Sequence, residues 1–417
     1  MRYLKVTLLI GFIVTLLAGS LFALGAFDRL DSSLWRFLGH TDAPGRHPLA
    51  QWFVAMILAF GVAWTTIDIQ RLSLKIVVAG GALVEVIGLT WVMNLHGAFF
   101  PPFASLLAGA LSFGAGIAYA GSKAGRRKRD LRLIFGERIS RKTFYTLLNS
   151  LVPLKFEGEF RDTTVVVCEI FNHDELMDSL PVSDYVAMTN LFLRHGGDFL
   201  VEQGAYLDEC DGESLRVVFG APLADDNHAA TACQATLELV KRLDALNQSC
   251  LERWQKAFDF RIGINSGEVV TAAYGSRRLG TFSVAGEPVE FARRLCSANT
   301  IYGSRVLIGS GTFNFAAEMI EVRPIELIRG RDDRSREEVY ELLSEKYGLP
   351  EAEMQRRDEF WKGVVYFREQ RWDEALTHFY AAASADGTPD GPLEFYVRRV
   401  EQLRAGVPVL DWENARF

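Results

Sequence analysis

The sequence predicts an α+β protein: four membrane-spanning helices precede a domain with a mixed β-sheet, and a short α-helical tail follows. Three observations support this fold class. Hydrophobic residues make up 49% of the 417-residue chain and are concentrated before residue 121. Strand and helix patterns alternate from residue 160 to 345, and only helical spacing remains afterwards. We therefore expect four regions, at residues 1–120, 121–155, 156–345 and 346–417.

The first region contains four apolar stretches, each close to the roughly 20 residues that a helix needs to cross a bilayer. They are Val6–Phe27, Trp52–Ile69, Leu74–Leu95 and Ala98–Ala120. The first stretch has too long an apolar core for a signal peptide, and no good small-residue cleavage site follows it. We expect it to remain in the protein as an anchor.

Basic residues predict the orientation in the membrane. The run Arg126–Arg129 follows the fourth stretch directly, and Arg132 comes soon after. Because such clusters stay on the cytoplasmic side, we expect a multi-pass protein of the inner (plasma) membrane with everything after residue 121 in the cytoplasm. The run is expected to contact membrane lipid as a stop-transfer anchor, and specific recognition of anionic lipid is the alternative.

Residues 121–155 begin with this basic run and continue with apolar side chains at helical spacing, among them Leu131, Phe135 and Leu147. The pattern predicts an amphipathic juxtamembrane helix that leads to a linker at Pro153.

Charge and cysteine content argue against two classes of site. The net charge is −7, and no pattern of basic and aromatic residues indicates a nucleic-acid surface. All five cysteines follow the membrane region, and none forms a CxxC pair. We expect reduced thiols in the cytoplasm, not disulfides or a zinc site.

Residues 156–345 carry the alternating pattern. β-branched and apolar runs predict strands at Thr163–Ile170, Phe258–Asn265, Gly267–Tyr274, Val306–Gly309 and Val339–Leu342. Apolar residues three or four apart predict helices at Pro181–Glu202, Asp226–Arg253 and Val289–Ser297. The alternation favours a mixed sheet with helices over one face.

The tail contains a helical pair. Apolar residues recur at helical spacing from Asp358 to Asp386, with a turn at Gln370–Trp372. The pair resembles one tetratricopeptide-like unit, and a single unit cannot form a solenoid. We therefore expect it to pack on the preceding domain.

An acidic hairpin at Tyr206–Pro222 is the most informative segment. Two short strands flank the turn Asp211–Glu213, where Gly212 can take the positive-φ backbone that tight turns often need. The second strand, Ser214–Phe219, is apolar and β-branched enough to be buried. A carboxylate at the tip of a buried hairpin can hold a divalent cation. This stretch resembles the metal-binding hairpin of class III adenylate and guanylate cyclases.

The resemblance extends over roughly residues 160–345, and RIGINSGEVVTAAYGS at Arg261–Ser276 closely resembles the core hairpin of that family. It implies a ferredoxin-like cyclase homology domain that acts as a homodimer or as a heterodimer with another cyclase-type domain. The implied substrate is a nucleoside triphosphate, with Mg²⁺ or Mn²⁺ as cofactor. The segment RRKRDLRLIFGERIS resembles the junction in CHASE2-linked bacterial cyclases, but only about 23 residues are available for an external sensor.

The resemblance places the two metal-binding positions at Glu169 and Glu213, where the family usually has Asp. Glu is a competent oxygen ligand for magnesium. It is one methylene longer than Asp, and a displacement of about 1 Å can cost ~100-fold in rate. The alternative is that both are acidic residues at a solvated strand end and hairpin tip.

Four further positions follow from the resemblance. The purine-selecting pair falls on Glu209 and Ser283, a combination that matches neither the adenylate nor the guanylate cyclases well. The family's Asn and its phosphate-binding Arg fall on Glu290 and Arg294, four residues apart on one helix face. Arg294 can bind phosphate, whereas Glu290 would repel it by about 3 kcal/mol at 5 Å and an effective dielectric of 20. The structural alternatives are an exposed strand charge at Glu209 and an intrahelical salt bridge between Glu290 and Arg294.

These substitutions leave three hypotheses for function. The first is a membrane-anchored cyclase in cyclic-nucleotide signalling with weak or lost conversion of ATP or GTP to the 3′,5′-cyclic nucleotide. The second is an inactive pseudoenzyme that serves as a dimerisation or regulatory module. The third is a structural subunit of a membrane complex.

Overall fold

The computed structural model describes residues 2–41, 48–69, 71–150, 154–275, 280–329 and 336–406. The chain divides into two compact units, Met1–Leu133 with Leu148–Ser150, and Ile134–Leu147 with Leu151–Phe417. The predicted linker at Pro153 lies outside the described residues.

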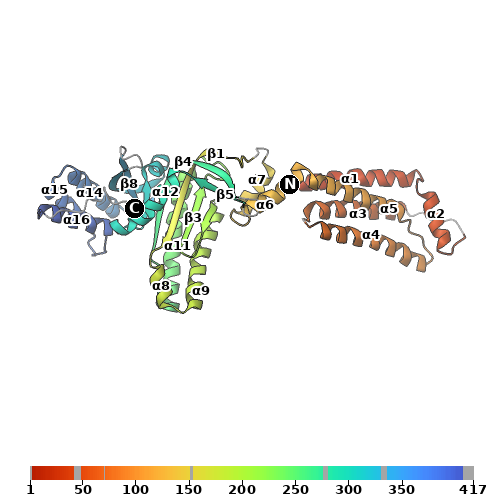
Figure 1. Cartoon of the computed structure of the whole chain (residues 1–417), viewed down its shortest axis with the longest axis horizontal. Helices are drawn as coiled ribbons and strands as arrows, with labels where there is room; N and C mark the ends of the chain where they lie inside the picture. Colours follow the sequence, from red (N-terminus) through yellow and green to blue (C-terminus); the bar gives the residue numbers. More distant parts are fainter. Residues whose placement is uncertain are drawn as a thin grey trace. The chain divides into compact units, whose positions relative to one another are not determined.

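The first unit is a helix bundle, drawn from red to orange in Figure 1. Its helices are α1 (Arg2–Ala23), α2 (Asp28–Phe37), α3 (Pro48–Asp68), α4 (Leu72–Leu95) and α5 (Phe103–Gly121). Four of them, all except α2, are long and apolar enough to cross a membrane, which confirms the four predicted spans. The short helix α2 was not predicted.

Small residues let the helices of this bundle approach one another. Ala18 of α1, Ala59 of α3 and Ala108 of α5 form a fully buried cluster. A Cβ on Gly11 would lie 2.5 Å from the ring of Phe60, and a Cβ on Gly19 would lie 2.3 Å from Trp52. The close packing of α1 on α3 therefore requires glycine at both positions.

Two short helices follow the bundle, α6 (Lys123–Phe135) and α7 (Arg141–Asn149). The predicted juxtamembrane helix is thus a pair of helices, separated by a turn in which Gly136 has positive φ. Phe135 is fully buried in the second unit, where its ring lies 5.9 Å from that of Tyr206 and 5.2 Å from that of Phe282.

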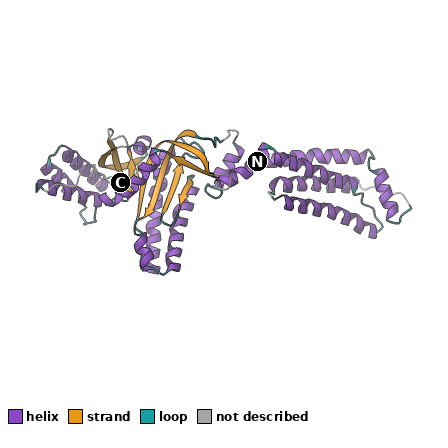
Figure 2. Cartoon of the chain, viewed as in Figure 1, coloured by secondary structure: helices purple, strands orange, loops and turns teal. Residues whose placement is uncertain are grey.

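The second unit is built on one mixed sheet, shown in orange in Figure 2. The strand order is β2-β3-β1-β4-β6-β8-β7, and β5 pairs with β4. All pairs are antiparallel except β4 with β6. The strands are β1 (Glu159–Ile170), β2 (Tyr206–Cys210), β3 (Ser214–Phe219), β4 (Phe260–Gly275), β5 (Gly280–Ala285), β6 (Val306–Gly309), β7 (Ile320–Arg329) and β8 (Arg336–Glu345).

The helices of this unit, in chain order, are α8 (His173–Ser179), α9 (Val182–Leu193), a π-helical turn (Arg194–Asp198), α10 (Phe199–Glu202), α11 (His228–Trp254), α12 (Glu287–Tyr302), α13 (Ser310–Ala316), α14 (Glu351–Arg368), α15 (Trp372–Ala382) and α16 (Gly391–Arg404). The predicted helix Pro181–Glu202 is therefore interrupted by a π turn, and the other predicted helices of this unit are present. The two strands predicted at Phe258–Asn265 and Gly267–Tyr274 are a single strand, β4, and neither β5 nor β7 was predicted.

Helices cover both faces of the sheet, so the expectation of helices over one face was wrong. On one face Val166 and Cys168 of β1 share a core with Phe192 of α9 and Leu239 of α11. On the other face α12 lies so close to β4 that a Cβ on Gly263 would meet the Ala292 carbonyl oxygen at 2.1 Å. Gly263 is thus the residue that lets α12 approach the sheet.

The tail packs on the second face, as predicted. A second core joins Phe291 and Leu295 of α12 to Phe360, Phe379 and Tyr396 of the tail helices. Tyr396 is fully buried, and its hydroxyl donates a hydrogen bond to the Ile325 carbonyl of β7. The sheet domain and the tail therefore share one continuous hydrophobic core.

Candidate functional site

The turn between β2 and β3 is shaped by Asp211. Its Oδ1 accepts hydrogen bonds from the backbone N–H of Glu213 (2.9 Å) and of Ser214 (2.7 Å), and its Oδ2 accepts one from the Ser214 hydroxyl (3.2 Å). Burial opposes ionisation of this carboxyl, but these hydrogen bonds outweigh burial and hold the pKa of Asp211 below its ordinary value. Gly212 is not among the described glycines with positive φ, so an Asx turn replaces the expected glycine turn.

The strand register brings Glu169 and Glu213 to the same end of the sheet. Glu169 of β1 is paired with Ser214, and the Glu213 carbonyl accepts a hydrogen bond from the Ile170 N–H at 2.9 Å. The Glu213 side chain is 59% exposed, and its Oε1 lies 2.9 Å from Nε2 of His173. The sequence pattern did not single out His173 as a partner of the expected metal ligands.

Glu169 is half-buried, and burial raises its pKa above the ordinary value. The carboxylates of Asp211 and Glu213 act in the same direction, whereas the Arg293 guanidinium and a hydrogen bond with Cys296 oppose the rise. Because neighbouring carboxylates raise the pKa of Glu169, a nearby cation stabilises its ionised form. Arg293 already supplies part of that positive charge.

The donor chemistry of Glu169 and Glu213 fits a magnesium-type ion. Magnesium is usually bound through one or two carboxylates together with substrate phosphates and water. Among the residues that the structure describes, no group of three or more His, Cys, Asp or Glu side chains is arranged to hold a metal ion. Glu169 and Glu213 supply two oxygen ligands of the kind that such an ion takes.

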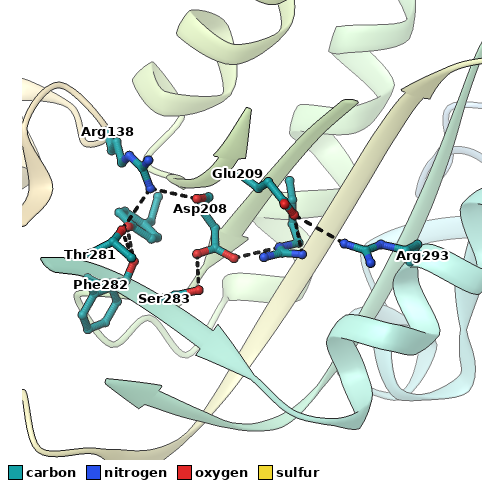
Figure 3. Close-up of polar contacts among 9 residues, drawn as sticks. Arg138, Asp208, Glu209, Thr281, Phe282, Ser283 and Arg293 are labelled. Carbon is teal, nitrogen blue, oxygen red and sulfur yellow. Dashed lines mark hydrogen bonds and ion pairs between the residues drawn. The ribbon is translucent and has the colours of Figure 1, made fainter. Parts of the chain in front are cut away.

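Ser283 of β5 lies with Asp208, not with Glu209. Its hydroxyl donates to Asp208 Oδ1 at 2.6 Å, as Figure 3 shows, and Asp208 Oδ2 accepts from Arg216 Nε at 2.7 Å. The Asp208 side chain is only 1% exposed. A bulge in β2 between Leu207 and Glu209 makes this possible, because it places both Asp208 and Glu209 against Arg216.

Glu209 joins two arginines. Its Oε2 lies 2.7 Å from Nη1 of Arg216 and 3.4 Å from Nη2 of Arg293 on α12 (Figure 3). Glu209 is 45% exposed, in keeping with the alternative of an exposed strand charge, and it is also paired with both arginines. The residues Ser283, Asp208, Arg216, Glu209 and Arg293 form one continuous polar chain, which we call the Arg216 network.

The juxtamembrane residue Arg138 contacts the strands that carry Asp208 and Ser283. Arg138, in the turn between α6 and α7, donates from Nη1 to the Asp208 carbonyl (2.9 Å) and to the Thr281 hydroxyl (3.1 Å). The Arg138 carbonyl in turn accepts from the Leu207 N–H at 2.9 Å. Arg138 therefore ties this turn to β2 and β5 beside the Arg216 network.

The first turns of α12 carry the two remaining predicted positions. Glu290 is exposed and belongs to the first turn, where the helix dipole favours a negative charge. Arg294 is half-buried, with its guanidinium carbon 5.5 Å from the centre of the Phe291 ring. Arg293, between them, is the arginine that contacts the Arg216 network.

The sheet of the second unit and the helices around it match a known protein family. The family model described as the adenylate and guanylate cyclase catalytic domain matches residues 158–334. The match covers strands β1–β7 and helices α8–α13, including the bulged strand β2 and the first turns of α12, and it ends before β8. It does not extend to the membrane region, so the likeness to CHASE2-linked cyclases stays a prediction.

Curated relatives match over the same part of the chain. Adenylate cyclase 1 of Rhizobium meliloti is 23% identical over 183 residues, which is 44% of this chain and 28% of that protein. An uncharacterised protein of Mycobacterium tuberculosis is 28% identical over 193 residues, 46% of this chain and 32% of that protein. The chain thus matches about a third or less of the length of these relatives.

Solved structures with similar coordinates include the guanylyl cyclase Cya2, at 23% identity and a TM-score of 0.42, covering 46% of this chain and 96% of that one. The adenylyl cyclase CyaB of P. aeruginosa, at 22% identity and a TM-score of 0.42, covers 46% of this chain and 99% of that one.

Proposed function

We propose that this chain is a membrane-anchored, cyclase-type protein of cyclic-nucleotide signalling, because residues 158–334 match the family model of the adenylate and guanylate cyclase catalytic domain. Its own conversion of ATP or GTP to the 3′,5′-cyclic nucleotide is weak or lost. The catalytic-type domain faces the cytoplasm and pairs with a second cyclase-type domain, either of the same chain or of another.

The observation that carries this proposal is the Arg216 network. Arg216 occupies the side of β2 and β5 on which the family resemblance places purine selection, and it is held there by Asp208 and Glu209 at 2.7 Å each. A purine that needs Ser283 free would have to break its 2.6 Å hydrogen bond to the buried Asp208 carboxylate, which costs about 1–3 kcal/mol. The exposed pairing of Glu209 with the two arginines adds only about 0–1 kcal/mol, and together these costs disfavour tight and specific binding of the base.

Negative charge near Arg294 weakens the expected binding of the triphosphate. Arg294 is the residue best suited to bind phosphate oxygens, since a guanidinium can donate two parallel hydrogen bonds. Glu290 lies one helical turn before it and adds a negative charge where the family has a neutral Asn. Arg293, which could offset this charge, is engaged by Glu209. Triphosphate binding is therefore expected to be weak but not abolished.

Glu169 and Glu213 are the residues that would hold Mg²⁺ or Mn²⁺, which polarises the phosphates and activates the ribose hydroxyl when bound. The Arg293 guanidinium places positive charge beside Glu169, and His173 contacts the Glu213 carboxylate at 2.9 Å. A metal ion must compete with both partners, and this supports low turnover.

A second candidate function is an inactive regulatory module. The tail shares a core with the domain, and Arg138 links the juxtamembrane turn to β2 and β5. A domain that is internally paired and that holds the juxtamembrane turn through Arg138 is suited to modulating a partner cyclase by dimerisation.

The two candidates are separated by turnover of the full-length chain in lipid vesicles. We expect pyrophosphate release from ATP or GTP, with Mg²⁺ or Mn²⁺, to be slow and to disappear in Glu213→Ala. Glu252→Ala, an exposed carboxylate on α11, is the matched control and should leave the rate unchanged. The absence of both turnover and a nucleotide-induced thermal shift would exclude the enzyme and leave the regulatory module.

A further inference from the structure

One lysine belongs to the buried face of α4, close to an end of the helix bundle. Lys75 is only 9% exposed and shares this face with Ala79, Val86 and Thr90. Among the residues that the structure describes, none accepts a hydrogen bond from its ammonium, and no carboxylate forms an ion pair with it. Because a buried charge without a partner is costly, this position favours an anion that the chain itself does not supply.

Lys75 lies at the depth of the lipid headgroups. It is three residues from the start of α4, or about 4.5 Å along the axis, and the 24-residue helix is about 36 Å long. Since a hydrocarbon core is about 30 Å thick, about 3 Å of the helix extends beyond it at each end, and Lys75 lies near the boundary. Its Nζ is not among the fully buried polar atoms that lack a partner, so the ammonium reaches the surface although its stem is buried.

Helix α6 brings a second cation to this end of the bundle. Lys128 of α6 lies 2.5 Å from Asp68, the last residue of α3, and α4 begins four residues later. The Arg129 guanidinium of α6 acts electrostatically on Lys75 and repels its ammonium. Asp130 neutralises little of the Arg129 charge, because the two groups are 3.9 Å apart and both largely exposed. Two cations that repel each other are both stabilised by one anion that contacts them together.

Positive charge exceeds negative charge over the whole of this end, which consists of the start of α1, the α3–α4 connection and α6. The basic residues whose side chains the structure describes there are Lys5, Arg71, Lys75, Arg126, Arg127, Lys128, Arg129 and Arg132, against the acidic residues Asp68 and Asp130. Such a cluster attracts anionic lipid, and basic sites between membrane helices bind anionic headgroups.

We propose that Lys75 and Arg129 bind the phosphate group of an anionic phospholipid. An ammonium and a guanidinium both donate charge-assisted hydrogen bonds to phosphate oxygens. The acyl chains of the same lipid lie in the hydrocarbon core, against the exposed apolar residues Leu72, Leu74 and Ile76 of α4. The lipid site rests on the membrane anchoring proposed above, and it requires neither nucleotide binding nor turnover.

Thermal midpoints of the full-length chain in neutral detergent micelles test this site, because a bound lipid stabilises the folded protein. We expect phosphatidylglycerol to raise the midpoint in a saturable way and phosphatidylcholine with the same acyl chains to have little effect. Lys75→Met and Arg129→Met should each weaken phosphatidylglycerol binding about tenfold, and Lys75→Arg should retain it. Lys5→Met, which removes an exposed charge from the same end of the bundle, is the matched control and should change it less than about twofold.

Without lipid, Lys75→Met should be at least as stable as the natural chain, because the substitution removes a buried charge that has no partner. A lower midpoint in that variant would mean that Lys75 is already neutralised within the protein, and the proposal would be wrong.

Three further outcomes would overturn the lipid site. Equal stabilisation by phosphatidylcholine would show that only the acyl chains bind, and an equal loss in Lys5→Met would show a general effect of charge. If inorganic phosphate alone reproduced the shift that Lys75→Met removes, the ligand would be a soluble anion. Extraction of the chain from native membranes by alkaline carbonate would instead reject the proposed membrane anchoring, which separates that failure from a failure of the lipid site.

Discussion

Two sets of residues on the same strands depend on different kinds of neighbour. Val166 and Cys168 of β1 and Val217 of β3 point into the core beneath α11, where each is at most 2% exposed and needs only apolar neighbours. On the same two strands, Glu169 and Arg216 belong to the polar site and need specific charged partners. The core therefore tolerates many residues of suitable size, whereas the site depends on particular pairs.

The largest expected effect is in the core. Phe192→Ala removes a fully buried ring from the face that α9 and α11 cover, and should lower the free energy of unfolding of the domain by about 3–5 kcal/mol. Hydrogen exchange of the β1 and β4 amides in the full-length chain would measure this loss. Leu251→Ala, on the exposed side of α11, is the control and should change it by less than about 0.5 kcal/mol.

The next effect is in the Arg216 network. Arg216→Met leaves the Asp208 carboxylate buried without its guanidinium, and should cost about 2–4 kcal/mol by the same hydrogen-exchange measurement. Adding Asp208→Leu to that variant should recover most of the loss, because replacing both members of a buried pair is often neutral. If the double variant is as unstable as the single one, the network does not behave as a coupled unit.

The sequence predicted the core better than the site, and the reason lies in how each is encoded. Apolar spacing located α9, α11 and α12, and β-branched runs located the residues of β4 although they predicted two strands there, because burial leaves a periodic trace in the sequence. The bulge that turns Asp208 inward leaves no such trace, and neither does the choice of Asp208 as the partner of Ser283. β7 was missed because it contains Pro324 and alternating charges, which obscure the strand pattern.

Glu290→Asn tests the electrostatics of the phosphate side directly. Removing this charge from α12 should tighten binding of ATP or GTP about tenfold, which is less than the full Coulomb term because Glu290 is exposed and screened by solvent. Titration of the full-length chain with nucleotide, followed by thermal shift, would measure the change. Glu252→Gln on α11 removes one negative charge far along the sequence from α12, and equal tightening in that variant would indicate a general charge effect.

The smallest expected effect is the pH dependence of stability, which has opposite signs for the carboxyls of Glu169 and Asp211. Burial raises the pKa of Glu169, so the folded state holds its proton more tightly than the unfolded chain does. Its contribution to stability is therefore largest below the ordinary pKa of 4.5 and declines as the pH rises through that value to the raised one. For Asp211 the hydrogen bonds of the turn overcome burial and lower the pKa, so its contribution is present above the ordinary value of 3.8 and is lost as the pH falls through the lowered one.

It follows that Glu169→Gln should raise the thermal midpoint of the domain at pH 7, whereas Asp211→Asn should lower it. The Glu169 difference should shrink as the pH falls towards 4, whereas the Asp211 difference should persist to about that pH and be lost only below it. Each is about 1.4 kcal/mol for every unit by which the pKa of the carboxyl shifts on folding. Thermal midpoints of the full-length chain between about pH 2 and 8 would measure both curves. A lower midpoint in Glu169→Gln at pH 7 would mean that Arg293 stabilises the Glu169 carboxylate by more than burial costs. The charge of Arg293 on α12 would then contribute more to the stability of this end of the sheet than the burial of Glu169 costs.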